Sequence, residues 1–154
     1  NDIFYNYLLS GIYSPKASIQ TIANAMDVGD PSNFARILDL YKSSHAEICN
    51  HISGATYSDD EIAATMKKCY EQTGYVLDPH GACGYQALKD NLKEGETGVF
   101  LETAHPAKFK EKVDAILSTD IEIPTRLADF MKGKKQSLEM AADFSAFKQF
   151  LLSV

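Results

Sequence analysis

Hydrophobic residues recur along most of the chain at the spacing of an amphipathic helix. The longest such pattern follows Asp30, a good capping residue, and Pro31, which suits a first helical position. It predicts one continuous helix of about six turns that buries a single face and ends at Gly54. The apolar positions of this face are Phe34, Ile37, Leu38, Tyr41, His45, Ile48 and Ile52.

The other predicted helices are bounded by caps and glycines. Ser58 and Glu61 have the spacing of a capping box, and Gly74 follows the last apolar position of that segment. Asp78 followed by Pro79 predicts the start of the next helix. Together with similar signals elsewhere, these patterns predict helices over residues 2–10, 58–74, from 78, from 106, 124–133 and from 143 onward, the last docking on the rest of the protein.

Short extended segments separate these helices. Residues 97–103 have the best strand composition, with an unalternated apolar run typical of a strand covered on both faces. Residues 75–77 and 18–22 are shorter candidates. The alternation predicts a helix-rich α/β fold with few strands of its own. Because so small a sheet would need further strands, we expect residues 1–154 to be a single unit that belongs to a larger sheet.

The helix predicted from Asp78 opens with the small residues Gly81, Ala82 and Gly84. Glycine is about 1 kcal/mol less favourable than alanine inside a helix. Two glycines here indicate either the close approach of another backbone or a ligand, or tight packing between helix and sheet. The residues alone leave both explanations open.

Composition and charge narrow the function classes. The chain has 15 Lys and Arg against 21 Asp and Glu, a net charge of −6, which argues against a nucleic-acid-binding module. We interpret the one basic run, Lys132–Lys135, as a solvated loop. No apolar stretch is long enough to cross a membrane. Three scattered cysteines without a C-x-x-C pair indicate reduced thiols, so we expect a cytoplasmic protein without membrane or nucleic-acid partners.

Several common catalytic and binding motifs are missing. The histidines His45, His51, His80 and His105 form no i, i+4 pair, so no metal site is predicted. The sequence contains no P-loop, no G-x-G-x-x-G phosphate cradle and no G-x-S-x-G nucleophile elbow.

Polar residues instead gather where three extended segments meet predicted helix N-termini, which favour anionic ligands. These clusters are residues 24–33, 78–82 and 102–109. Helix capping accounts for Asp30 and Asp78. It does not by itself explain Thr103, His105 and Lys108, which follow the carboxyl end of the best predicted strand.

These clusters resemble the motifs of threonine synthases, pyridoxal-phosphate enzymes of the tryptophan-synthase-β-like group (fold type II). The matching stretches are residues 10–15, 24–34, 78–82 and 101–109, in the order of the family. The resemblance covers essentially the whole chain but only the C-terminal part of the family. It implies a carbon–oxygen lyase of threonine biosynthesis, which converts O-phospho-L-homoserine and water to L-threonine and phosphate.

The same resemblance places the Schiff-base lysine and the glycine-rich phosphate loop of the family in its N-terminal half. Neither motif is present here, and the sequence opens at Asn1 directly into apolar residues. We therefore expect a C-terminal fragment that lacks the N-terminal half, assign no catalytic residue to it, and expect the fragment alone to be inactive and not to hold pyridoxal phosphate.

Seven residues are carried over from the family's motifs. Thr103 resembles the hydroxyl partner of the cofactor's pyridine nitrogen, which a neutral partner leaves largely unprotonated. A substrate-side loop is implied at Asp27, Ser32 and Asn33. Residues that line the site or meet the substrate phosphate are implied at His80, His105 and Lys108. A lysine suits phosphate as a point charge. The alternative, that Lys108 simply faces solvent, is nearly as well supported by the sequence.

A second class of function stays open at this point. The chain could be a non-catalytic helical binding module derived from such an enzyme. An apolar face left exposed on this module would then support self-association.

Overall fold

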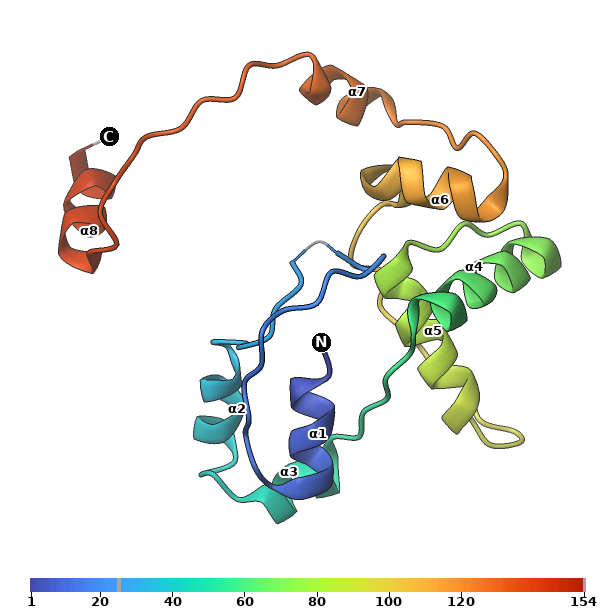
Figure 1. Ribbon diagram of the computed structural model, residues 1–154, viewed down its shortest axis with the longest axis horizontal. Coiled ribbons are helices and arrows are strands. Elements are labelled where there is room, and N and C mark those ends of the chain that lie inside the picture. The colour runs from blue at the N-terminus through green and yellow to red at the C-terminus, as the bar shows by residue number, and fades with distance from the viewer. Residues whose placement is uncertain (25, 154) are drawn as a thin grey trace. The chain divides into compact units, whose positions relative to one another are not determined.

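The computed structural model describes residues 1–24 and 26–153, and the chain divides into two compact units, residues 1–122 and 123–154 (Figure 1). Each unit is helical, and no β-strand is present among the described residues. The helix-rich fold is therefore confirmed. That both units belong to one domain of a larger enzyme stays a prediction. The first unit contains α1 (Ile3–Ser10), α2 (Phe34–Leu40), α3 (His45–His51), α4 (Asp59–Thr73), α5 (Pro79–Asn91), η1 (Pro106–Phe109) and α6 (Lys110–Leu117).

The three predicted strands do not form. Residues 18–22, 75–77 and 97–103 have no strand structure, and the side chains of Val99 and Leu101 are 84% and 79% exposed. A strand exists only as part of a hydrogen-bonded ladder, so strand composition in one segment is not sufficient without a neighbouring strand.

The prediction of one long helix from Asp30 to Ile52 is also wrong, because two separate helices, α2 and α3, occupy this stretch. Lys42 and Ser43 have left-handed φ angles of 50° and 57°, and the Ser43 amide donates to the Leu38 carbonyl at 2.7 Å. Ser44 then caps α3 by accepting a hydrogen bond from the Glu47 amide. The break allows both halves to pack on α1, where Tyr7, Phe34 and Ile48 form one buried cluster.

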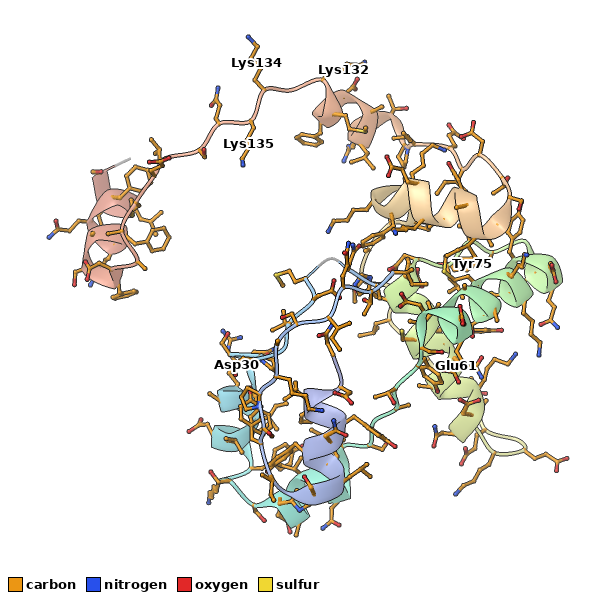
Figure 2. The ribbon with its side chains drawn as sticks, viewed as in Figure 1. Asp30, Glu61, Tyr75, Lys132, Lys134 and Lys135 are labelled. Atoms are coloured by element: carbon orange, nitrogen blue, oxygen red, sulfur yellow. The ribbon has the colours of Figure 1, made fainter. Side chains whose placement is uncertain are left out.

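Asp30 has a different role from the predicted cap. Helix α2 begins at Phe34 with Asn33 in the N-cap position, three residues later than expected. The Asp30 carboxylate instead accepts a hydrogen bond from the Tyr13 hydroxyl at 2.8 Å, and Figure 2 labels Asp30 beside α2. The contact ties the start of the loop between α1 and α2 to its end.

A second cluster forms the larger core of the first unit, between α4, α5 and α6. The capping box predicted at Ser58 and Glu61 is present, and Gly74 ends α4 with a left-handed φ of 73°. Asp78 caps α5 as predicted, and α6 continues from the short helix η1. This packing holds the start of α5 beside the segment that leads into η1. The buried residues are Ile62, Met66, Cys69, Leu77, Ala82, Phe109, Val113 and Leu117.

The second unit contains α7 (Thr125–Met131) and α8 (Phe144–Ser153), which lie close to the predicted helices. Its apolar side chains are exposed, among them Phe130 and Phe144. Docking of α8 on the first unit stays a prediction. The basic run is solvated as interpreted, since Lys132, Lys134 and Lys135 are exposed and extend away from the ribbon (Figure 2).

A search of the described residues for membrane-spanning helices finds none with the necessary length and hydrophobicity.

The capping box makes a first prediction about stability. Replacing Ser58 with alanine removes the acceptor for the Glu61 amide, so we expect the free energy of unfolding to fall by about 1 kcal/mol. Urea denaturation measures this change. Ser137→Ala, an exposed serine outside any helix, is the matched control and should be neutral. Equal stability of both variants would show that the capping box contributes nothing measurable.

Candidate functional site

A cavity beside the predicted site residues Thr103 and His105 lies where the segment before α5 meets the segment before η1. It has a volume of about 700 Å³, within the range of small-molecule sites. Thr103 and His105 both line it and are exposed, so their side chains are accessible to a ligand there. The other lining residues are Tyr75, Val76, Glu102, Ala104, Pro106, Ile121 and Glu122.

A pair of carboxyl groups lies at this place, and one of them, Glu102, lines the cavity. Asp78 is fully buried, and its Oδ1 accepts a hydrogen bond from the His80 amide at 2.9 Å while also contacting His80 Nδ1 at 2.9 Å. The Asp78 amide donates to Glu102 Oε1 at 2.8 Å. Glu102 is thereby held at the N-terminus of α5, where free amides favour a carboxyl group.

The surroundings of Glu102 change its acidity. Burial raises the pKa of Glu102 to about 7, and the neighbouring Asp78 carboxyl contributes in the same direction. The hydrogen bond from the Asp78 amide opposes this shift because it stabilises the charged form. The residue directly before Thr103 therefore gains or loses its proton near neutral pH.

The small residues at the start of α5 are explained by the same carboxyl group. A Cβ atom at Gly81 would lie 2.0 Å from Glu102 Oε2, whereas one at Gly84 would meet only the Phe100 side chain at an ordinary 3.8 Å. The group that approaches Gly81 is thus the Glu102 side chain, which the sequence analysis did not consider. Gly81 indicated the close approach of another group, but the sequence analysis did not identify that group as Glu102.

His105 has a structural role in addition to lining the cavity. Its Nδ1 accepts a hydrogen bond from the Ala107 amide at 3.1 Å and so caps η1. Capping therefore explains more of this cluster than the sequence analysis assumed. Lys108, in the same short helix, is exposed and does not line the cavity beside Thr103.

Asp27 lies in a different cavity of about 610 Å³. Its carboxylate accepts hydrogen bonds from the Thr21 hydroxyl at 2.8 Å, the Thr21 amide at 3.2 Å and the Asn1 side chain at 3.1 Å. These bonds hold the loop between α1 and α2 in shape. The stretch 24–34 includes Ala25, which lies outside the described residues.

The remaining predicted residues line neither of these cavities. Ser32 and Asn33 are exposed just before α2, and Asn33 makes no side-chain capping bond. The ring of His80 packs against Phe109 with a centroid distance of 5.1 Å. The structure thus brings Thr103 and His105 together and leaves Asp27, Ser32, Asn33, His80 and Lys108 elsewhere. The ligand contacts assigned to all seven stay predictions.

The sequence can now be placed beside known proteins. The family model for pyridoxal-phosphate-dependent enzymes matches residues 1–103, more than half of the chain. The chain belongs to this family. A second model, for the C-terminal part of threonine synthase, matches residues 81–151. The resemblance to a C-terminal segment of threonine synthases is therefore confirmed.

Individual relatives agree with this assignment. Threonine synthase of Haemophilus influenzae is 43% identical over 152 residues, and that of Escherichia coli is 39% identical over 153 residues. Each alignment covers 99% of this chain and 35% of the relative. The chain thus spans about a third of the length of the threonine synthases that it matches.

Solved structures match the fold as well. The crystal structure of threonine synthase from Escherichia coli superposes with a TM-score of 0.78 at 38% identity, covering 99% of this chain and 35% of that one. The PLP-bound threonine synthase from Brucella melitensis gives a TM-score of 0.67 at 26% identity, covering 97% and 37%. The predicted fold class, part of a fold of this enzyme group, is confirmed.

The contact between Gly81 and Glu102 makes a second prediction. Gly81→Ala displaces the Glu102 carboxyl from the Asp78 amide, and an unsatisfied buried donor costs about 1–3 kcal/mol. Gly84→Ala, in the same helix, has room for its methyl group and should stabilise by about 0.5–1 kcal/mol. Urea denaturation of both variants measures these opposite effects. A stabilising Gly81→Ala substitution would show that Glu102 is not held at this position.

Proposed function

We propose that this chain forms part of a threonine synthase, which converts O-phospho-L-homoserine and water to L-threonine and phosphate. The observation that carries this proposal is the identity of 43% with a threonine synthase over 99% of the chain. The fold match to a threonine synthase at a TM-score of 0.78 supports it independently.

The residues around Thr103 fit pyridoxal phosphate. The cavity of about 700 Å³ exposes the neutral hydroxyl of Thr103. As a partner for an uncharged ring nitrogen, a hydroxyl is more suitable than a carboxylate. When bound, the cofactor supplies the electron sink for the reaction. We propose that the Thr103 hydroxyl donates a hydrogen bond to the pyridine nitrogen, orienting the ring without giving that nitrogen a full positive charge.

The other site residues are proposed on the substrate side. Lys108 is exposed and carries a point charge suited to a phosphate group, while His80 and His105 flank the same short helix and the start of α5. Asp27, Ser32 and Asn33 are proposed for a substrate-side loop. No lysine of this chain is assigned as the Schiff-base residue, so we propose that the 154-residue chain alone neither turns over substrate nor retains the cofactor.

We also propose a cytoplasmic location. Cys49, Cys69 and Cys83 are free thiols, as expected for a reducing compartment. O-phospho-L-homoserine is the proposed small-molecule partner.

Phosphate release from O-phospho-L-homoserine tests the function. The longest chain that the gene encodes and the 154-residue chain are assayed side by side with added pyridoxal phosphate. We expect release from the longer chain only. Release from the 154-residue chain would contradict the proposal that it lacks essential catalytic groups. No release from either would contradict the threonine synthase assignment.

The role of Thr103 is tested in the active longer chain. Thr103→Val keeps the shape but removes the hydroxyl, and one hydrogen bond worth about 1–1.5 kcal/mol corresponds to a loss of about tenfold in kcat/KM. Thr97→Val, an exposed threonine that does not line the cavity, should retain full activity. Equal turnover of the wild type and Thr103→Val would remove Thr103 from the site.

A further inference from the structure

Two buried carboxyl oxygens beside the candidate site have no hydrogen-bond partner within the part of the chain that the structure describes. They are Asp78 Oδ2 and Glu102 Oε2. The other oxygens of this pair are already engaged, Asp78 Oδ1 with His80 and Glu102 Oε1 with the Asp78 amide. A buried acceptor without a donor is costly, so this pair of atoms needs an explanation.

Among the described residues, no lysine or arginine forms an ion pair with Asp78 or Glu102. The ion pairs of lysine among the described residues involve Asp2, Asp114, Asp120 and Asp129, and neither Asp78 nor Glu102. The titratable groups near the two carboxyls include Tyr75 from the segment before α5, His80 and Cys83 from α5, and His105 from the segment before η1. His80 contacts Asp78 at Oδ1.

A single proton satisfies both oxygens at once. If Glu102 is protonated, its hydroxyl becomes a donor for the Asp78 carboxylate, beside which the bond from the Asp78 amide already holds the Glu102 carboxyl. Two carboxylates without this proton would repel each other, because each has a buried oxygen without a donor. The Asp78 amide and the close contact with Gly81 hold Glu102 in the required place.

We propose that Glu102 is a positioning residue for Thr103: Glu102 shares one proton with Asp78, and this clamp fixes residues 102–105 against the start of α5. Thr103 follows Glu102 directly in the sequence. Where the inference concerns the cofactor, it rests on the proposed function, in which Thr103 contacts the cofactor. With the proton in place the pair carries one negative charge instead of two. Less negative charge near Thr103 favours an uncharged ring nitrogen, which a neutral hydroxyl partner also requires.

NMR spectroscopy of the full chain tests the clamp without cofactor or substrate. The side-chain carboxyl carbons and backbone amides are followed between about pH 4 and pH 9, a range that spans the ordinary carboxyl and histidine titrations. We expect Glu102 to titrate with a midpoint near 7 and the amides of Asp78 and Thr103 to shift with that midpoint. In E102Q, which keeps the acceptor and offers an N–H to Asp78, this shift at Thr103 should disappear.

Glu122→Gln is the matched control, since Glu122 is an exposed carboxyl that lines the same cavity. It should leave the Thr103 titration unchanged. The proposal is overturned if the Thr103 titration is the same in E102Q as in the wild type, or if Glu102 titrates together with the exposed Glu94.

Unfolding as a function of pH provides a second readout. Folded Glu102 keeps its proton up to a pH of about 7, whereas the unfolded residue has its ordinary pKa of 4.5. The folded state binds more protons in this window, so wild-type stability should fall relative to E102Q as the pH rises through it. A pH-independent difference between the two would contradict the shared proton. These measurements need no enzymatic activity, so failure of the clamp and failure of the threonine synthase assignment are separate outcomes.

Discussion

The hydrogen bond from the Asp78 amide to the Glu102 carboxyl joins the two segments from which the candidate site is built. One segment opens α5 and the other leads into η1, and they are 24 residues apart in the sequence. Packing of α4, α5 and α6 brings them close, but packing alone does not determine how the chain runs from Glu102 to His105. A directional bond to a buried amide does so, because its donor is anchored by the helix that Asp78 caps.

Gly81 makes this arrangement sterically feasible. A carboxyl group can reach the amides at the start of a helix only where the first turn presents no side chain in its path. Gly81, the buried cap Asp78 and the Glu102 carboxyl therefore depend on one another. Each of these residues would be unfavourable at its position without the other two. Glycine in a helix costs conformational entropy and a buried carboxyl costs desolvation, and the hydrogen bond from the Asp78 amide to Glu102 offsets part of these terms.

Local signals in the sequence predicted the helix boundaries well where side chain and backbone interact within one turn. The capping box of Ser58 and Glu61, the cap and proline at Asp78, and the left-handed Gly74 all depend on residues within a few positions of each other. The pairing of Glu102 with Asp78 was not predictable in this way, since it connects distant segments. The strand at 97–103 failed for the same reason, because a ladder depends on a partner that its own composition does not specify. Family resemblance located Thr103 and His105, but the cavity they share became visible only in three dimensions.

The break between α2 and α3 has a consequence for how this region tolerates change. Lys42 and Ser43 both adopt left-handed backbone angles, which are unfavourable for residues with a side chain by roughly 1–2 kcal/mol each. Glycine or asparagine would relieve that strain, and a β-branched residue would increase it. Replacing Lys42 or Ser43 with glycine or asparagine should therefore stabilise the fold. Both residues are exposed and lie outside the buried cluster around α1, so divergence there could compensate for destabilising changes elsewhere without altering that cluster or the contacts of Glu102.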